Sequence, residues 1–213
     1  MRVLGMGGDV LKRSPPEGAA FRLENMYGPT ECTVLATRHT VKPGELHPPI
    51  GSPIDNYRVY VADPSTLDLQ LIGVPGELLV GGAGIARGYI GRDDLTAERF
   101  LTDPFLERAA AAAAEVGTRI YRTGDLVRWL PEGELEFLGR IDGQVKIRGH
   151  RIELGEIDAV LLQQPNVLEA ATMVRGDTTA SKRLIAYVAP IEGQTLSVVE
   201  LRTALSRVLA EYM

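Results

Sequence analysis

The run LGRIDGQVKIRGHRIELGEID, residues 138–158, constrains the fold of this 213-residue chain more than any other segment. Val145 and Ile147 alternate with two basic residues, which is the period of a strand with one buried face. The pair 142–143, Asp-Gly, can adopt turn conformations that most residues avoid. Apolar residues then recur at helical spacing, which predicts a helix at about 155–163.

The segments on the two sides of this run differ in pattern, and we interpret Asp142 as a joint between them. Residues 1–141 are rich in glycine and in short alternating runs, whereas residues 142–213 alternate strands with helices. Strands are expected near 168–175 and 183–189. The alternative is one more hairpin turn inside a single domain, and spacing alone leaves both readings open.

Smaller patterns predict further elements. The expected strands are a buried strand within residues 1–13 that ends at Gly7 and an alternating strand through Leu67, Leu69 and Leu71, and a hairpin is expected around residues 131–133. An exposed helix is expected over the alanine run 109–114. A last helix is expected to be capped by Ser197 and Glu200, with Leu201, Leu205 and Val208 on its buried face.

Composition excludes several classes of function. The net charge of -5 gives no reason to expect nucleic acid or an anionic membrane as a partner. The chain contains no apolar run of membrane-spanning length and no secretion signal at residue 1. With a single cysteine, Cys32, an internal disulfide is impossible, and a reducing, cytoplasmic location fits. Three scattered histidines and one cysteine argue against a zinc site.

The loop NMYGPTE, residues 25–31, gathers several polar groups around a Gly-Pro turn. Such a loop could stack a base on Tyr27 and hold a metal–phosphate unit with Thr30 and Glu31. An ordinary polar turn with a packed tyrosine is the alternative.

Asp125 follows a glycine in YRTGDL, on backbone that a ligand can approach closely, so its carboxylate could bind a sugar diol. A solvated turn aspartate is the alternative. The glycine run 81–84 follows a strand but lacks the Lys-Ser/Thr of a phosphate-binding loop, so we interpret it as a structural bend.

Taken together and in this order, the motifs resemble the adenylate-forming enzyme superfamily, most closely the amino-acid adenylation domains of nonribosomal peptide synthetases. The matching segments are NMYGPTE (25–31), GELLVGGAGIARGY (76–89), LTAERF (95–100), YRTGDL (121–126) and GRIDGQVKIRGHRIELGEID (139–158). The resemblance implies an α+β fold, in which residues 1–141 are the β-rich, distorted barrel-like C-terminal part of the large AMP-binding domain. Residues 142–213 would be a truncated C-terminal lid domain.

The resemblance also implies roles for individual residues. Tyr27 would stack on adenine with Asn25 beside its edge, and Thr30 would contact the α-phosphate. Glu31 would help to bind Mg²⁺. Asp125 would hold the ribose hydroxyls of ATP or AMP, with Arg140 reaching the same region.

Further roles concern movement and the substrate. Asp142 would be the hinge of the lid, and Gly149 would lie on the loop beside the phosphopantetheine arm of a carrier protein. The substrate pocket would include Gly5, Gly7, Met26, Val34 and Leu35. Because none of these is charged, an apolar or neutral amino acid is favoured.

The chain departs from the family at both ends. The phosphate loop, the aspartate that holds the substrate amine and the catalytic lysine of the lid are missing, so we expect a fragment that is inactive alone. The parent would be a ligase of secondary-metabolite biosynthesis that adenylates an amino acid. Two alternatives are an acyl-CoA ligase of the same superfamily and a non-catalytic module that docks a carrier protein.

Overall fold

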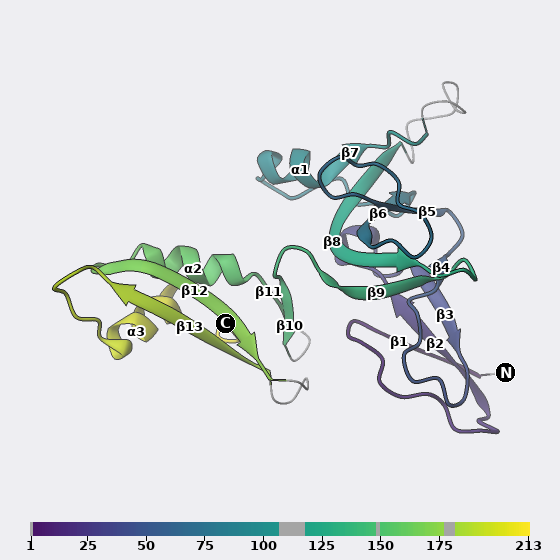
Figure 1. Ribbon diagram of the computed structural model, residues 1–213, viewed down its shortest axis with the longest axis horizontal. Coiled ribbons are helices and arrows are strands. Elements are labelled where there is room, and N and C mark those ends of the chain that lie inside the picture. Colours follow the sequence, from purple (N-terminus) through teal and green to yellow (C-terminus); the bar gives the residue numbers. More distant parts are fainter. Residues whose placement is uncertain (1, 107–117, 148–149, 177–181) are drawn as a thin grey trace. The chain divides into compact units, whose positions relative to one another are not determined.

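The structure is a computed structural model that describes residues 2–106, 118–147, 150–176 and 182–213. The alanine run 109–114 and Gly149 lie outside these residues. Contacts divide the chain into two compact units, Met1–Ile141 and Asp142–Met213, called here the first and the second unit (Figure 1). None of the described helices has the length and apolar character required to cross a bilayer.

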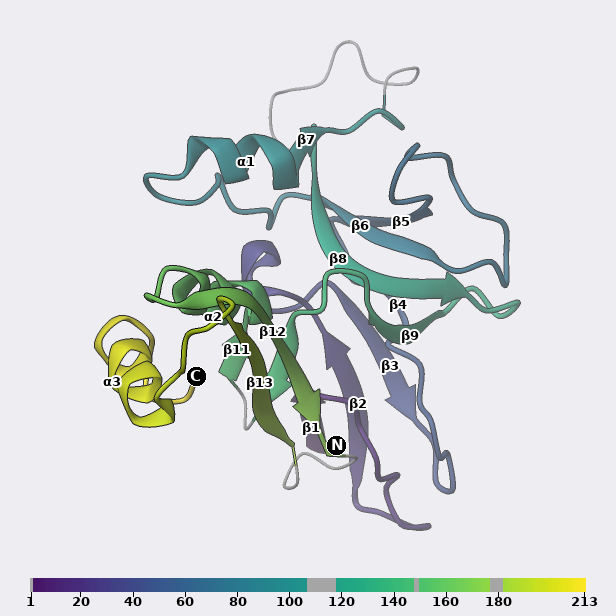
Figure 2. The ribbon, with the colours of Figure 1, turned by 60° about the vertical axis from the view of Figure 1, so that its left-hand side comes forward.

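One sheet of the first unit is built on β2, beside which β1 and β3 lie (Figure 2). Its strands, in spatial order, are β1 (Arg2–Gly7), β2 (Phe21–Tyr27), β3 (Thr37–Val41) and β4 (Ser52–Pro53). The β1–β2 pair is parallel, and the other pairs are antiparallel. A short 3-10 helix, η1 (Thr30–Cys32), follows β2.

The other sheet of the first unit is antiparallel and is centred on β6. Its strands, in spatial order, are β5 (Tyr57–Ala62), β6 (Gly76–Gly82), β8 (Arg119–Trp129) and β7 (Phe100–Thr102), and β9 (Leu135–Arg140) pairs with β8. Helix α1 (Asp93–Arg99) precedes β7. Among the described strands no sheet closes on itself, so the expected barrel-like part consists of open sheets.

The two sheets of the first unit are joined at Gly51. The amide of Ile50 donates to the carbonyl of Leu135 at 2.8 Å, and the amide of Leu135 donates to the carbonyl of Gly51 at 2.8 Å. Gly51 has a φ of +81°, and a Cβ placed on it would lie 1.9 Å from the carbonyl oxygen of Arg38. Only glycine permits this backbone conformation and this approach.

The main core of the first unit lies between the sheets. Its buried residues come from η1, the loop after it, the loop before β4 and all five strands of the larger sheet; they are Cys32, Ala36, Ile50, Val61, Leu78, Val80, Phe100, Tyr121, Val127 and Leu135. Every residue of β6 is buried, which fits a central strand whose two edges are both paired.

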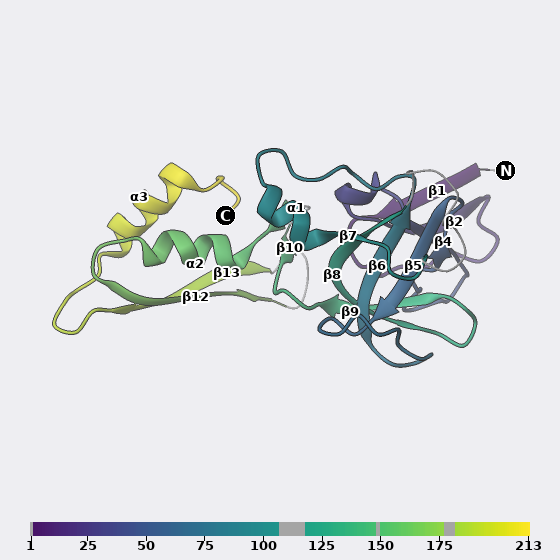
Figure 3. The same ribbon diagram turned by 90° about the horizontal axis from the view of Figure 1, so that it is seen from above.

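The second unit is a small α+β layer. Its elements are the hairpin β10 (Val145–Ile147) and β11 (His150–Ile152), α2 (Leu154–Leu162), the hairpin β12 (Val167–Arg175) and β13 (Arg183–Pro190), and α3 (Val198–Val208). Helices α2 and α3 lie on the same face of the β12–β13 pair (Figure 3). The core between them contains Ile152, Ile157 and Leu161, and the second unit confirms the α+β pattern expected after residue 142.

Most local predictions are confirmed. The hairpin at 131–133 closes with the amide of Leu130 donating to the carbonyl of Glu134 at 2.8 Å, and the Ser197 side chain caps α3 by accepting from the amide of Glu200. Val208 is a correction, because it is 69% exposed while Leu201 and Leu205 face the core. A helix this short needs only a narrow apolar stripe.

Two strand predictions are wrong in part. β1 forms as expected, but all six of its residues are exposed rather than buried. Residues 67–71 form no strand beyond one bridge at Leu69, since Leu67 has a left-handed φ of +62° and Leu71 is 78% exposed. Alternation of apolar residues marks the period of a strand but does not establish that another strand pairs with it.

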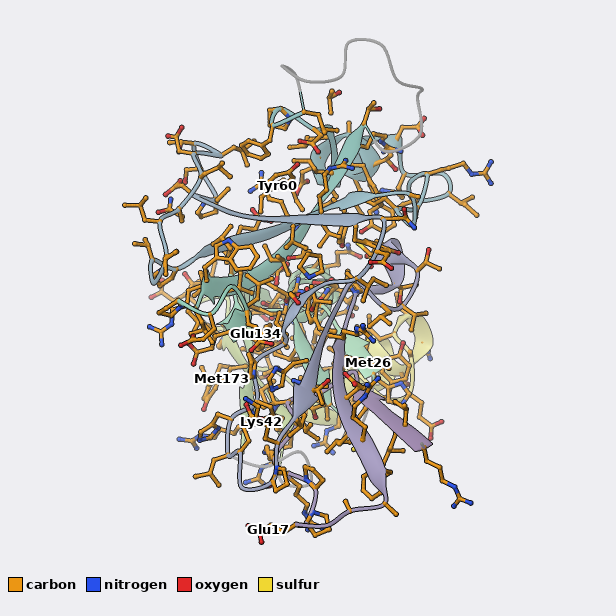
Figure 4. All side chains as sticks on the ribbon, turned by 90° about the vertical axis from the view of Figure 1, so that its right-hand side faces the viewer. Glu17, Met26, Lys42, Tyr60, Glu134 and Met173 are labelled. Atoms are coloured by element: carbon orange, nitrogen blue, oxygen red, sulfur yellow. The ribbon has the colours of Figure 1, made fainter. Side chains whose placement is uncertain are left out.

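Buried His39 on β3 forms a cluster with the half-buried Glu45 and Glu134, and Glu134 is labelled in Figure 4. The Nδ1 atom of His39 lies 2.7 Å from Glu134 Oε1, and the Nε2 atom of His39 lies 3.1 Å from both carboxylate oxygens of Glu45. Burial lowers the pKa of His39, but the hydrogen bonds and charges of Glu134 and Glu45 outweigh burial and raise it. The cluster ties β3 to the turn between β8 and β9.

The central position of β6 generates the first prediction. Leu78 is fully buried, so Leu78→Ala should lower the free energy of unfolding by about 2–5 kcal/mol through the lost apolar contacts and the cavity that remains. Urea denaturation followed by the fluorescence of Trp129, the single tryptophan, measures this in the first unit. Leu71→Ala is the control, because Leu71 is 78% exposed. Equal losses in both variants would contradict the assignment of the core.

The His39 cluster generates the second prediction. A histidine whose folded pKa is raised stabilises the fold below its unfolded pKa of about 6.5, and this stabilisation is lost as pH rises through the folded value. The free energy of unfolding should therefore fall as pH rises above about 6.5 in the wild type, and less steeply in His39→Gln. The control is His47→Gln, at an exposed position of the loop that follows β3. Parallel pH profiles for wild type and His39→Gln would refute the prediction.

Candidate functional site

A bulge in β8 presents the carboxylate of Asp125. Between two register pairs, a single residue of β6, Leu78, faces the three residues 123–125 of β8. Gly124, in the middle of the bulge, has a φ of +71°, a conformation that glycine adopts without steric cost. The sequence therefore places a glycine where the strand must depart from regular pairing, directly before the acidic residue.

The carboxylate of Asp125 accepts hydrogen bonds from a guanidinium and from a phenol. Arg140 lies opposite it on β9 and donates from Nη1 to Asp125 Oδ1 at 2.8 Å. The hydroxyl of Tyr27, from the end of β2, donates to Oδ2. The Asp125 carboxylate is buried, so a paired guanidinium and a hydroxyl donor are what such a charge requires.

Tyr27 remains protonated over the ordinary pH range. Burial raises its pKa well above 10, and the negative charge of Asp125 and the hydrogen bond to it raise the pKa further. The phenol is thus a donor to the carboxylate. Its ring centroid lies 6.5 Å from that of Phe137 on β9, with the rings tilted by 37°.

Asn25 lies two residues before Tyr27 on β2, and the two side chains therefore share a face of the strand. Its amide nitrogen donates to the carbonyl of Pro49 at 2.7 Å and approaches that of Pro48 at 3.4 Å. The buried amide is therefore engaged by the backbone of the 48–49 loop, and it braces this loop against β2.

Glu31 lies in η1, where the chain turns sharply after β2, and its side chain is buried. The hydroxyl of Tyr89 donates to Glu31 Oε1 at 2.7 Å and lies 3.3 Å from the hydroxyl of Tyr121. Burial raises the pKa of Tyr89, and its hydrogen bonds to Tyr121 and Glu31 raise it further. Thr30, beside Glu31, is exposed.

Glu31 is suited to a hard cation only as one ligand among several. Carboxylate oxygen is a donor that Mg²⁺ accepts, and protein sites for Mg²⁺ often supply one or two carboxylates while phosphates and water complete the coordination. Within the described part of the chain, no group of three or more His, Cys, Asp or Glu residues could hold a metal ion. A metal at Glu31 would therefore depend on a bound phosphate.

The predicted pocket residues fall into two groups. Gly5 and Gly7 lie on β1 against Met26 of β2, where an added Cβ would come within 2.6 Å of the Met26 sulfur and 2.3 Å of its carbonyl oxygen, respectively. The contact requires small residues on β1, and Met26 is labelled in Figure 4. Val34 and Leu35 lie in the loop after η1, and Val34 is 78% exposed.

The loop at 34–36 is close to the end of β2 because Gly28 has no side chain. A Cβ on Gly28 would lie 2.8 Å from the Cα of Leu35, and the amide of Ala36 donates to the carbonyl of Tyr27 at 2.8 Å. The structure thus gathers the end of β2, η1 and this loop. It brings Tyr27, Asp125 and Arg140 into direct contact, whereas Glu31 contacts Tyr89 instead.

Two predicted residues, Asp142 and Gly149, belong neither to the predicted substrate pocket nor to the residues around Asp125 and Glu31. Asp142 is the first residue of the second unit, and its Oδ1 accepts from the amide of Gln144 at 3.2 Å. Gly143 follows with a φ of +69°. Gly149 lies outside the described residues. Tyr89 was not predicted; it ends the segment 76–89, but no local pattern links it to a residue 58 positions earlier.

Comparisons with known proteins show which proteins the chain is similar to. Residues 1–90 match the family described as AMP-binding enzyme. Over 216 aligned residues the chain is 46% identical to one of the linear gramicidin synthase proteins of Brevibacillus parabrevis, and the alignment covers 100% of this chain and 4% of that protein. The segment is thus a small fraction of the length of this relative.

Solved structures show the same fold. The crystal structure of IdnL1 has a TM-score of 0.82 and 25% identity, covering 100% of this chain and 42% of that one. Holo-PA1221, an NRPS protein containing adenylation and PCP domains bound to a vinylsulfonamide inhibitor, has a TM-score of 0.71 and 32% identity, covering 90% and 33%. The chain belongs to the AMP-binding enzyme family and corresponds to part of an adenylation domain of the nonribosomal peptide synthetase type.

Proposed function

We propose that this segment supplies the ribose- and adenine-binding part of a domain that activates an amino acid with ATP. The observation that carries the proposal is the buried Asp125 carboxylate, held by Tyr27 and by Arg140 at 2.8 Å. Each carboxylate oxygen can accept more than one hydrogen bond, so Asp125 can accept from the two ribose hydroxyls while it keeps these donors. The similarity to a linear gramicidin synthase favours an amino acid over a fatty acid as the substrate.

The proposed reaction has two steps. In the first, the carboxylate of the amino acid attacks the α-phosphorus of ATP, a phosphorus–oxygen bond forms, and pyrophosphate leaves with the electron pair of the broken bond. In the second, the thiol of a phosphopantetheine arm on a carrier domain attacks the acyl carbonyl, its proton is lost, and AMP leaves. Both steps need the adenosine held in one place while its phosphate bears changing charge.

The residues of the first unit have separate tasks in this scheme. Asp125 fixes the ribose, the Tyr27 ring offers a face for adenine, and Arg140 places positive charge beside the same group. Thr30 and Glu31 would face the α-phosphate, with the Glu31 carboxylate orientated by Tyr89. A bound Mg²⁺ would supply charge neutralisation for the phosphates, and Glu31 would be its protein ligand.

The third prediction tests the ribose assignment. Asp125→Ala should weaken AMP binding by about 2–4 kcal/mol, since hydrogen bonds to a buried charged group are lost. Tyr27→Ala should weaken it by about 1–3 kcal/mol, by analogy with stacking of bases on aromatic rings. Calorimetric or NMR titration of the chain with AMP measures both.

A matched control is Asp103→Ala. Asp103 is also a buried carboxylate paired with an arginine, at 3.2 Å from Arg58, but it follows β7 and accepts from Arg58 and Tyr60 instead of Arg140 and Tyr27. This variant should lower stability and leave the affinity of the folded protein for AMP unchanged. A folded Asp125→Ala variant with wild-type affinity would show that the ribose is not held there.

We also propose that Asp142 is the hinge between the two units. Gly143, the next residue, has a φ of +69°, a backbone conformation that a branched side chain disfavours. The fourth prediction is that Gly143→Val, in a longer protein that carries this segment and a carrier domain, slows thioester formation more than adenylate formation. Pyrophosphate exchange and loading of the carrier measure the two steps. Equal slowing of both would remove the hinge from the proposal, and Gly133→Val, in an exposed turn with a φ of +79°, is the control.

A further inference from the structure

We propose that Glu77 and Thr123 are positioning residues that hold the bulge of β8 and thereby orientate the Asp125 carboxylate. Glu77 contacts neither Asp125 nor Tyr27 through its hydrogen bonds, whereas Thr123 borders the proposed site through the amide of Asp125 and the hydroxyl of Tyr27. The proposal rests on the proposed role of Asp125 in ribose binding, and it assigns a task to two buried polar side chains on the neighbouring strands β6 and β8.

The bulge creates a hydrogen-bonding deficit that a regular ladder would not have. Residues 123–125 have no register partner on β6. The backbone amides of Gly124 and Asp125 therefore need other acceptors than the carbonyls of a regular ladder. Glu77 Oε1 accepts from the amide of Gly124 at 3.1 Å. Thr123 Oγ1 accepts from the amide of Asp125 at 3.0 Å and donates to the carbonyl of Leu78 at 2.7 Å. Two side chains thus take the place of the missing backbone partners.

Glu77 is itself held in a fixed orientation. Its other oxygen, Oε2, accepts from Arg122 Nε at 3.0 Å and from Nη2 at 2.6 Å. Nη2 of Arg122 also donates to the carbonyl of Pro64 at 2.7 Å. Glu77 is only 2% exposed, and a buried carboxylate is costly unless it is paired and hydrogen-bonded. Arg122 therefore neutralises the charge of Glu77 at one oxygen, while the other oxygen accepts from the amide of Gly124.

The consequence for Asp125 follows from its place in the bulge. Its amide is one of the two that these side chains bind, and Gly124 before it has a left-handed φ. If the bulge relaxes, the Asp125 carboxylate moves relative to Tyr27 and Arg140. Displacements of about 1 Å in a positioning group can cost on the order of a hundredfold in function.

The test compares AMP with 2′,3′-dideoxy-AMP, which lacks both ribose hydroxyls. We define the ribose ratio as the Kd for dideoxy-AMP divided by the Kd for AMP, measured by titration of the chain. The wild type should show a ribose ratio of about ten or more, the value of lost hydrogen bonds to a charged group. Glu77→Val and Thr123→Val should lower this ratio about three- to tenfold, with affinity for dideoxy-AMP unchanged.

Conservative variants and a control separate positioning from stability. Glu77→Gln and Thr123→Ser keep an acceptor for the bulge amides, so they should keep the ratio within about twofold. Glu136→Ala removes another glutamate paired with an arginine of β8, at 2.6 Å from Arg128 but outside the bulge, and should keep the wild-type ratio. A purely structural effect would weaken both ligands alike and leave the ratio unchanged.

The outcomes distinguish the two proposals. A wild type with a ribose ratio near one would reject the ribose role of Asp125; the bulge contact itself is then decided by the amide proton shift of Gly124, which must move in Glu77→Val. A wild type that discriminates, together with unchanged ratios in folded Glu77→Val and Thr123→Val, would overturn the positioning role alone. Should Glu77→Val fail to fold, the near-isosteric Thr123→Val decides.

Discussion

The pairing of β6 with a strand on each side is the constraint on which the rest of the first unit depends. All seven residues of β6 are buried, and its neighbours β5 and β8 are hydrogen-bonded to its two edges. Such a strand has no solvent-facing side to absorb irregularity, so any departure from regular pairing must be satisfied internally. The bulge of β8 opposite Leu78 is such a departure, and Glu77 is the charged residue that accompanies it.

Stability and the proposed nucleotide binding would therefore be coupled through one strand. The apolar side chains of β6 build the core, while its single carboxylate, that of Glu77, accepts from the amide of Gly124 in the bulge that carries Asp125. The carboxylate of Asp125 then connects β8 to β9 through Arg140 and to the smaller sheet through Tyr27. A polar network of this kind contributes rigidity only when every member is satisfied, because an unpaired buried group is costly.

Much of the fold could be predicted from local sequence. The hairpin at 131–133, the strand at Val145–Ile147 and the helices of the second unit all follow from patterns within about ten residues. The burial of β1 could not be predicted, because its apolar residues specify a strand but not a covering layer. Residues 67–71 failed for a related reason: Leu67 adopts a left-handed conformation that alternation of apolar residues does not reveal.

The candidate site shows the same division. Tyr27, Glu31, Asp125 and Arg140 were identified because they stand in recognisable motifs, and the motif order suggested that they belong together. Their partners Tyr89, Glu77 and Thr123 were missed as partners, although each lies within a quoted motif. The contacts that define them join Tyr89 to a residue 58 positions away and Glu77 and Thr123 to residues 45 or more positions away. A single sequence does not show which residues so far apart along the chain come into contact, whereas the structure does.

The exposed strand β1 has a practical consequence for handling this segment in solution. Among the described strands it pairs with β2 alone, and Val3, Leu4 and Met6 are each about half exposed. Natural edge strands are commonly protected by lysine, proline or a bulge, and β1 carries one terminal arginine and two glycines instead. An isolated preparation thus presents a template for strand addition by another copy of itself. Colloidal behaviour at high concentration would then be governed by a strand whose last residue, Gly7, pairs with Met26 next to Tyr27.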